Sequence, residues 1–262
     1  MNTTFLDVSV AQFQVFLLVF LRTLGVLATA PIFGHRAVIS QAKAGFAFAL
    51  ALVLFPSTPV TLAVTTDLAP YVFGAVKEIT MGIMFGFVSR LVFVAVQFAG
   101  EVIGIDIGFG VVNVIDPLSA EQISIIGTFK NLIAMVTFLM IDGHHILLHA
   151  LAESFAMVPL GGVQLTELLA AGLVDMTSRV FVMAMKLAAP VVVALFLTSI
   201  ALGIMARTMP QMNVFIVGFP LKIFVGMGMM SMTLPMFQTI LMKMFYELGP
   251  NLSILLEHMY TP

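Results

Sequence analysis

Apolar residues are concentrated in six long stretches of the chain, and a short polar or proline- and glycine-containing segment separates each stretch from the next. The stretches are Val10–Phe33, Ala44–Val64, Phe73–Ala99, Ile123–Ala152, Arg179–Met205 and Val214–Tyr246. A helix needs about 20 apolar residues to cross the hydrocarbon core of a bilayer, and every stretch reaches that length. No stretch shows the apolar–polar alternation of a half-buried strand. The pattern predicts an all-α protein with about six long apolar segments, some of them broken.

The segments that separate these stretches are short. They are Gly34–Lys43, Thr65–Pro70, Gly104–Gln122, Pro159–Thr166 and Arg207–Asn213. None is long enough to act as a linker between domains, so we predict one domain over residues 1–262. Pro235 can kink or split the last stretch, because proline removes one backbone hydrogen bond from a helix.

Composition excludes a water-soluble globule. Hydrophobic residues make up 61% of the 262 residues and charged residues 9%, whereas soluble domains carry about 25% charged residues. The net charge of −2 argues against nucleic acid as a partner. The absence of cysteine rules out disulfides, thiol nucleophiles and iron–sulfur sites. The class is therefore an integral membrane protein or a subunit of a membrane complex.

The first apolar stretch has some features of a signal peptide, because the run Phe13–Leu27 ends at small residues, Ala28–Ala30. However, no Lys or Arg precedes the run, and Arg22 interrupts it. We therefore predict a retained helix.

Charged residues occur singly inside or at the edges of the apolar stretches, not in alternate short loops as the positive-inside rule expects. They are Arg22, Glu78, Arg90, Glu101, Asp106, Lys130, Lys186 and Lys222. Charges at membrane depth are costly unless they find partners. We therefore predict that many segments contact other proteins or water-filled space, and that some form helical hairpins that do not cross the bilayer.

Glycines recur at a spacing of four in two places. The first pair is Gly82 and Gly86, and the second series is Gly100, Gly104 and Gly108, with Glu101 beside it. Small residues at this spacing allow helix backbones to approach closely in apolar surroundings. We predict that both sets lie at helix contacts, although a generic helix crossing gives the same pattern.

A polar block lies between the last two stretches and reaches into the final one. Its members are Arg207, Pro210, Gln211, Asn213, Gly218, Pro220 and Lys222. One interpretation is a polar network with neighbouring subunits, in which low dielectric strengthens each hydrogen bond. The other is a local cap that satisfies the helix ends around Pro210. The two can coexist.

The same block matches R-x-x-P-Q-x-N-V-F-x-V-G-F-P-x-K, the signature of the FliR/SctT family of type III secretion export-gate proteins. The resemblance extends over essentially the whole chain. Further matching residues are Arg22, Gly25, Pro31, Phe33, Glu78, Gly82, Gly86, Gly100, Glu101, Gly104, Gly108, Phe109, Asp116, Pro117, Asp142, Gly143, His144, His145, Ser154, Pro159, Pro190 and Gly203. The chain departs from the family pattern at Lys43, Asp106 and Gly110, where Arg, Gln and Ser are expected. The pattern is nearer the flagellar branch than the injectisome branch.

This resemblance implies a non-enzymatic subunit of the flagellar export gate, without a cofactor, in the bacterial inner membrane and the flagellar basal body. The subunit would assemble stably with FliP and FliQ into a helical, conical channel for unfolded flagellar proteins. Part of that cone is raised toward the periplasm. FlhB and FlhA would dock on its cytoplasmic side.

The loop Ile105–Gln122 resembles the plug that helps to close the resting pore in this family. The plug residues that the resemblance implies are Phe109, Gly110, Val111, Val112, Val114, Ile115, Asp116 and Pro117. Apolar side chains at a constriction can block ions by dewetting, and Gly108 and Gly110 allow the loop to move. The alternative is that these residues pack as buried core or belong to a helix.

Three histidines raise the question of a metal site. His145 and His149 lie one helical turn apart, but the sequence HILLH lacks the glutamate of HExxH, and Glu153 lies another turn along. The match of Asp142–His145 to the family favours a structural role, with Asp142 as a helix N-cap. We predict no metal, no catalytic residues and no nucleotide site.

Two other functions stay open. The first is the injectisome homologue of the same family. The second is a secondary transporter, because broken helices and charges at membrane depth also mark that class. A transporter of this kind is expected to contain an internal repeat, and the sequence shows none that is convincing.

Overall fold

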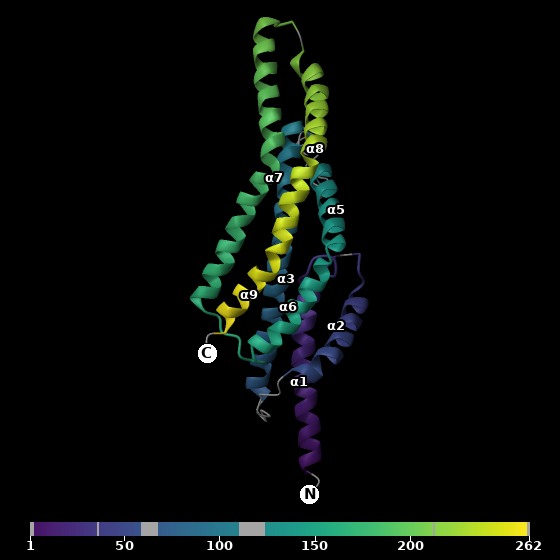
Figure 1. Ribbon diagram of the computed structural model, residues 1–262, viewed down its shortest axis with the longest axis vertical. Helices are drawn as coiled ribbons and strands as arrows, with labels where there is room; N and C mark the ends of the chain where they lie inside the picture. The colour runs from purple at the N-terminus through teal and green to yellow at the C-terminus, as the bar shows by residue number, and fades with distance from the viewer. Residues whose placement is uncertain (1–2, 36, 59–67, 110–123, 212, 261–262) are drawn as a thin grey trace. The chain divides into compact units, whose positions relative to one another are not determined.

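Helices account for all the regular secondary structure in the part of the chain that the structure describes. This computed structural model describes residues 3–35, 37–58, 68–109, 124–211 and 213–260 (Figure 1). The helices are α1 (Thr3–Thr29), α2 (Ser40–Leu54), the 3-10 turn η1 (Phe55–Ser57), α3 (Leu68–Ile107), α5 (Ile125–Met140), α6 (Gly143–Met157), α7 (Glu167–Thr208), α8 (Val214–Tyr246) and α9 (Leu248–Met259). The predicted all-α class is confirmed.

The predicted number of about six long apolar segments is approximate. Among the described residues, α1, α3, α7 and the segment Ile216–Met259, which is α8 continued by α9, are long and apolar enough to cross a membrane. Helices α5 and α6 make a fifth if they are counted as one broken span. Helix α2 has 15 residues, fewer than the ~20 that a span needs. The predicted second stretch continued to residue 64, but residues 59–67 lie outside the described part.

The fourth apolar stretch is two helices and not one. Helix α5 ends at Met140 and α6 begins at Gly143. Between them, Asp142 adopts a left-handed backbone conformation with φ of 55°, which aspartate tolerates better than most residues. A left-handed residue cannot continue an α-helix, so the break falls at the Asp–Gly pair.

The ends of two other helices differ from the predicted ones. Helix α3 begins at Leu68, and the predicted separator residue Pro70 lies in its first turn, where proline costs no hydrogen bond. Helix α7 begins at Glu167 and not near residue 179. The hydroxyl of Thr166 accepts a hydrogen bond from Leu169 N at 3.1 Å, and this cap stabilises an early start. Helix α8 continues past Pro235 without splitting.

The chain divides into two compact units. The first consists of residues 1–91, 142–176 and 246–262, and the second of residues 92–141 and 177–245. The long helices α3 and α7 each contribute residues to both units. The single domain over residues 1–262 stays a prediction.

In the first unit, α1 packs against α2, and α6 packs against α9 (Figure 1). Aromatic side chains fill the α1–α2 contact, where the ring of Phe48 lies 5.3 Å from that of Phe16 and 6.3 Å from that of Phe20, both edge to face. Such pairs stabilise beyond the area that they bury. This contact positions α1, which carries Arg22.

In the second unit, three phenylalanines join α3, α5 and α8. The rings of Phe93, Phe138 and Phe245 lie between 5.1 and 5.6 Å apart. Further along, α7 and α8 run side by side as a hairpin whose connection is residues 209–213 (Figure 1). A side chain at Gly226 of α8 would meet Leu195 of α7 at 3.5 Å, so the two helices are in close contact.

Candidate functional site

The connection of the α7–α8 hairpin carries the first part of the predicted polar block. Arg207 lies in the last turn of α7, and the side chains of Arg207, Pro210 and Gln211 are exposed. Asn213 precedes α8, and its Oδ1 accepts a hydrogen bond from Ile216 N at 3.4 Å. A local cap is therefore present at Asn213, while the side chains of Arg207 and Gln211 are exposed.

The remainder of the block lies along α8. Gly218 is buried, and a Cβ there would lie 3.3 Å from Leu202 Cδ1 of α7. Pro220 is exposed and Lys222 is half-buried. Lys222 follows Asn213 by nine residues, which is roughly 14 Å along a helix. The block is therefore not one compact cluster, and Lys222 is too far along α8 to belong to the polar group at the hairpin connection.

The predicted plug falls mostly outside the described residues. Helix α3 extends to Ile107, so the first residues of the predicted loop are helical. The chain then turns at Gly108, which has φ of 109°. A Cβ at this position would lie 2.6 Å from the ring of Phe219. Phe109 is half-buried in that turn. Gly110, Val111, Val112, Val114, Ile115, Asp116 and Pro117 lie outside the described residues.

The two glycine series face different helices. In the first unit, a Cβ on Gly82 would meet the backbone of α1, with Gly25 Cα at 2.9 Å, and a Cβ on Gly86 would meet Ala30 N at 2.8 Å. In the second unit, a Cβ on Gly100 would meet Gly127 N of α5 at 2.7 Å. Backbone atoms cannot move aside as a flexible side chain can, so these positions hold glycine at the helix contacts.

Two further predicted packing residues, Gly104 and Glu101, lie on the same part of α3. Gly104 faces the hydroxyl of Ser124, which would lie 3.0 Å from a Cβ. The half-buried carboxylate of Glu101 accepts a hydrogen bond from Gln97 Nε2 at 3.2 Å. Glu101 therefore has a partner on its own helix.

A buried ion pair lies within the first unit, and the sequence did not reveal it. Arg22 of α1 is 1% exposed and Glu78 of α3 is 0% exposed. Arg22 Nε and Nη2 both donate to the Glu78 carboxylate, the latter at 3.1 Å. The expectation that such charges contact other proteins or water is wrong for these two residues, because they neutralise each other across two helices.

Backbone groups complete the coordination of this pair. Arg22 donates to the carbonyl oxygens of Ser154 at 2.9 Å and Val158 at 3.2 Å, and Gly161 N donates to the Glu78 carboxylate at 2.7 Å. The guanidinium carbon lies 4.4 Å from the centre of the Phe155 ring. The pair thus ties α1, α3, α6 and the turn before α7 together. Charge-assisted hydrogen bonds of this kind are the strong ones.

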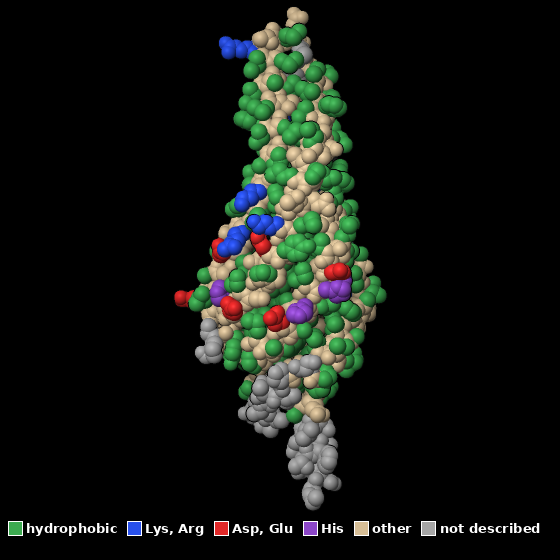
Figure 2. Space-filling view, viewed as in Figure 1, with side chains coloured by type: hydrophobic (Ala, Val, Ile, Leu, Met, Phe, Trp, Pro, Cys, Tyr) green, Lys and Arg blue, Asp and Glu red, His purple; other side chains and the backbone are tan. Residues whose placement is uncertain are grey.

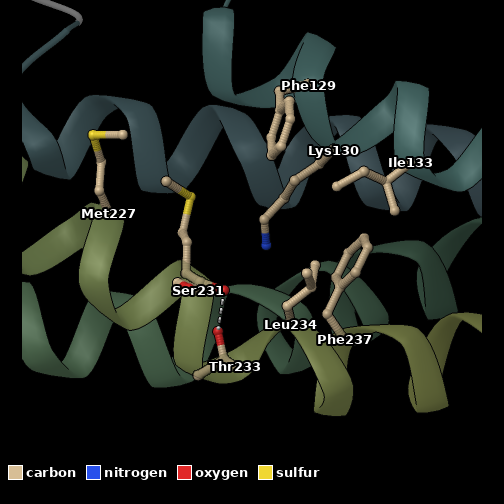
Figure 3. A pocket seen from close by; sticks show the side chains of 9 residues that line it. Phe129, Lys130, Ile133, Met227, Ser231, Thr233, Leu234 and Phe237 are labelled. Atoms are coloured by element: carbon tan, nitrogen blue, oxygen red, sulfur yellow. Dashed lines mark hydrogen bonds between the residues drawn. The ribbon is translucent and has the colours of Figure 1, made fainter.

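A second buried charge is that of Lys130 on α5. Its side chain is 6% exposed, and its Nζ lies 4.6 Å from the centre of the Phe237 ring. Within the described residues, its ammonium group forms no ion pair or hydrogen bond. Figure 3 shows the ammonium pointing into a cavity between α5 and α8. The cavity has a volume of about 260 Å³ and is lined by Phe129, Lys130, Ile133, Met227, Met230, Ser231, Thr233, Leu234 and Phe237.

The start of α6 gathers three groups that could hold a metal ion: Asp142, His144 and His145, whose ligand atoms lie within 4.8 Å of one another. His145 Nδ1 is 3.5 Å from Asp142 Oδ1. Asp142 stands at the N-cap position, but its side chain forms no cap hydrogen bond, so that part of the prediction is wrong. The sequence paired His145 with His149, whereas the group of three that the structure brings together joins His145 to His144 and Asp142.

Comparisons with known proteins agree with one another. The family described as bacterial export proteins, family 1, matches residues 13–248. The flagellar biosynthetic protein FliR of Bacillus subtilis (strain 168) is 36% identical over 236 residues, covering 89% of this chain and 91% of that protein. The protein of the same name from Escherichia coli (strain K12) is 31% identical over 229 residues, covering 87% of each. That from Pectobacterium carotovorum subsp. carotovorum is 28% identical over 240 residues, covering 92% of each.

Proposed function

The chain belongs to family 1 of the bacterial export proteins, and from that membership we propose that it is a FliR-type subunit of the flagellar type III export gate. In this role it assembles with FliP and FliQ subunits in the inner membrane, at the flagellar basal body. The assembly forms the channel through which unfolded flagellar proteins pass, and FlhB and FlhA dock on its cytoplasmic side. The subunit is not an enzyme. The observation that carries the proposal is the family match over nearly the whole chain.

The surface of the α7–α8 hairpin supports a role inside a larger assembly. In the apolar window of the Ile216–Met259 segment only 11% of the residues are buried. Large apolar side chains such as Phe196, Ile204, Phe224 and Met232 are exposed, and hydrophobic side chains run along the hairpin on the face in Figure 2. Exposed apolar surface of this extent needs protein or lipid to cover it.

The residues singled out by the sequence take roles in this proposal. The hairpin connection, with Arg207, Pro210, Gln211 and Asn213, contacts neighbouring subunits, while Gly218, Pro220 and Lys222 shape and line the first turns of α8. The segment from Phe109 to Pro117 acts as the pore plug. The glycine series and Glu101 set the helix packing. Support comes from the exposed polar side chains at the connection and from Gly108, whose φ of 109° ends α3 in a turn immediately before that segment.

Flagellar export in the native host tests the proposal. A strain that lacks the gene is expected to export no flagellar filament protein into the medium, and the wild-type gene supplied in trans is expected to restore export. Undiminished export in the deletion strain would refute the proposal. If small-molecule uptake were lost instead, the transporter alternative would gain support. Loss of virulence-protein secretion with normal flagella would point to the injectisome homologue.

A further inference from the structure

The Lys130 cavity, defined by the nine lining residues above, is apolar except for one cation and two hydroxyl-bearing side chains. One wall comes from α5 and the other from α8, both in the second unit (Figure 3). The hydroxyl of Thr233 donates to the carbonyl of Met229 on its own helix at 2.8 Å. The chemistry available to an occupant is therefore an ammonium group surrounded by Phe, Met, Leu and Ile side chains.

A buried ammonium is unstable without a counter-ion. Removing a charge from water is costly unless the charge is paired and hydrogen-bonded. Contact with the face of Phe237 offsets part of that cost, but a ring cannot neutralise the charge. Arg22 in the other unit shows what full compensation looks like in this chain, with a carboxylate and two carbonyl groups around the cation. Within the described part of the chain, Lys130 has none of these partners.

The size of the cavity and the character of its rim indicate what fits. About 260 Å³ is below the ~300–1,000 Å³ typical of small-molecule sites, but it accommodates a side chain. The exposed side chains of Phe129, Met227 and Leu234 form an apolar rim. An Asp or Glu on an apolar helix matches both features. The methylene groups of its side chain and the apolar residues beside it cover the rim, while its carboxylate reaches the ammonium group of Lys130.

We propose that the Lys130 cavity receives the carboxylate of an Asp or Glu from an apolar helix of a neighbouring subunit, and that this residue forms an ion pair with Lys130. The pair fixes the position of that helix between α5 and α8. Ionisable residues inside membrane segments characteristically pair with one another. This inference rests on the proposed function, since it requires a neighbouring subunit.

Zero-length cross-linking of the purified wild-type complex tests the ion pair directly. A water-soluble carbodiimide activates a carboxylate, the neutral lysine amine attacks the activated carbonyl carbon, and the carbodiimide leaves as a urea. An amide bond forms only where amine and carboxylate are already in contact. Mass spectrometry of the digest is expected to find the Lys130 peptide joined to an Asp or Glu peptide of another subunit.

Variants give a second readout with a matched control. Lys130→Met keeps the length of the side chain and suits the apolar cavity, but it leaves the partner carboxylate buried without a cation. We expect this variant to raise the apparent Kd of the complex about 30-fold, measured by following dissociation when the solubilised complex is diluted. Lys130→Arg is expected to retain assembly. Lys186→Met is the matched control, because it removes an exposed charge from α7 of the same unit outside the cavity, and its effect on assembly is expected to be much smaller than that of Lys130→Met.

The outcomes separate this inference from the proposed function. If the wild-type chain purifies without partner subunits, the proposed function fails. If it purifies with them, and Lys130→Met assembles like Lys186→Met with no Lys130 cross-link, only the ion pair is refuted. A cross-link to a carboxylate of this same chain, or a phospholipid that the wild type binds in native mass spectrometry and Lys130→Met does not, would also overturn it. Exchanging the charges, with Lys130→Glu and a lysine at the cross-linked partner position, is expected to restore assembly.

Discussion

The Arg22–Glu78 pair yields the most quantitative prediction. Glu78→Gln keeps the shape of the side chain but leaves the guanidinium of Arg22, 1% exposed, without its counter-ion. Breaking a buried ion pair by removing one partner costs about 3–5 kcal/mol. Arg22 retains its bonds to the carbonyls of Ser154 and Val158, so we expect a loss near the lower end, about 3 kcal/mol.

The measurement is helix content followed by circular dichroism during heating in one mild detergent. A loss of about 3 kcal/mol corresponds to a fall in the apparent Tm of roughly 6–12 °C for a chain of this size. The matched control is Glu257→Gln, because Glu257 is an exposed carboxylate on α9 of the same unit. Its effect is expected to stay within about 0.5 kcal/mol.

A double variant tests the physical reason. Arg22→Met with Glu78→Leu removes both charges and fills the site with apolar atoms, which is often close to neutral for a buried pair. We expect it to be more stable than Glu78→Gln alone. The reasoning is refuted if Glu78→Gln behaves like the Glu257 control. It is also refuted if the double variant loses the sum of the losses measured for Arg22→Met and Glu78→Leu separately, because either result means that the two charges do not interact.

Three further predictions concern the packing, the hairpin and the plug. Gly82→Ala places a Cβ against the α1 backbone, and we expect it to destabilise the protein by about 1–3 kcal/mol in the same heating assay. The control is Gly74→Ala on the same helix, where a Cβ would meet no atom within 4 Å, and we expect it to be neutral or stabilising. Equal effects of the two variants would contradict the close contact at Gly82. Asn213→Ala removes a helix cap worth about 1 kcal/mol. We expect this variant and Pro210→Ala to reduce both co-purification with partner subunits and flagellar export. Normal assembly in both variants would exclude a contact role for the α7–α8 connection. Deleting residues 110–115 is expected to raise ion leak through the inner membrane, measured as loss of membrane potential, and an unchanged potential would count against a sealing role.

The long apolar stretches were sufficient to predict the all-α class, because apolar runs of this length without strand-like alternation favour helices. Where the sequence failed, a single residue decided the outcome. The break before α6 depends on the left-handed conformation of Asp142, and the early start of α7 depends on the cap at Thr166. Neither changes the hydrophobic pattern enough to be seen in it.

The charged residues show a different limit. Arg22 and Glu78 are 56 positions apart, and their pairing depends on how α1 and α3 are rotated against each other. The same glycines that the spacing singled out, with Gly82 against Gly25, bring those two helices close enough for the pair to form. The sequence showed both the charges and the glycines, but only the fold relates them. Lys130 is the converse case, since only the fold shows that its charge has no partner among the residues that the structure describes.

Co-purification tests the central claim most directly. The protein, tagged at its C-terminus in its native host, would be released from membranes by a mild detergent, passed through size exclusion, and analysed by mass spectrometry. The account predicts one large complex that contains FliP- and FliQ-like subunits. A monodisperse monomer or homodimer without such subunits would contradict it.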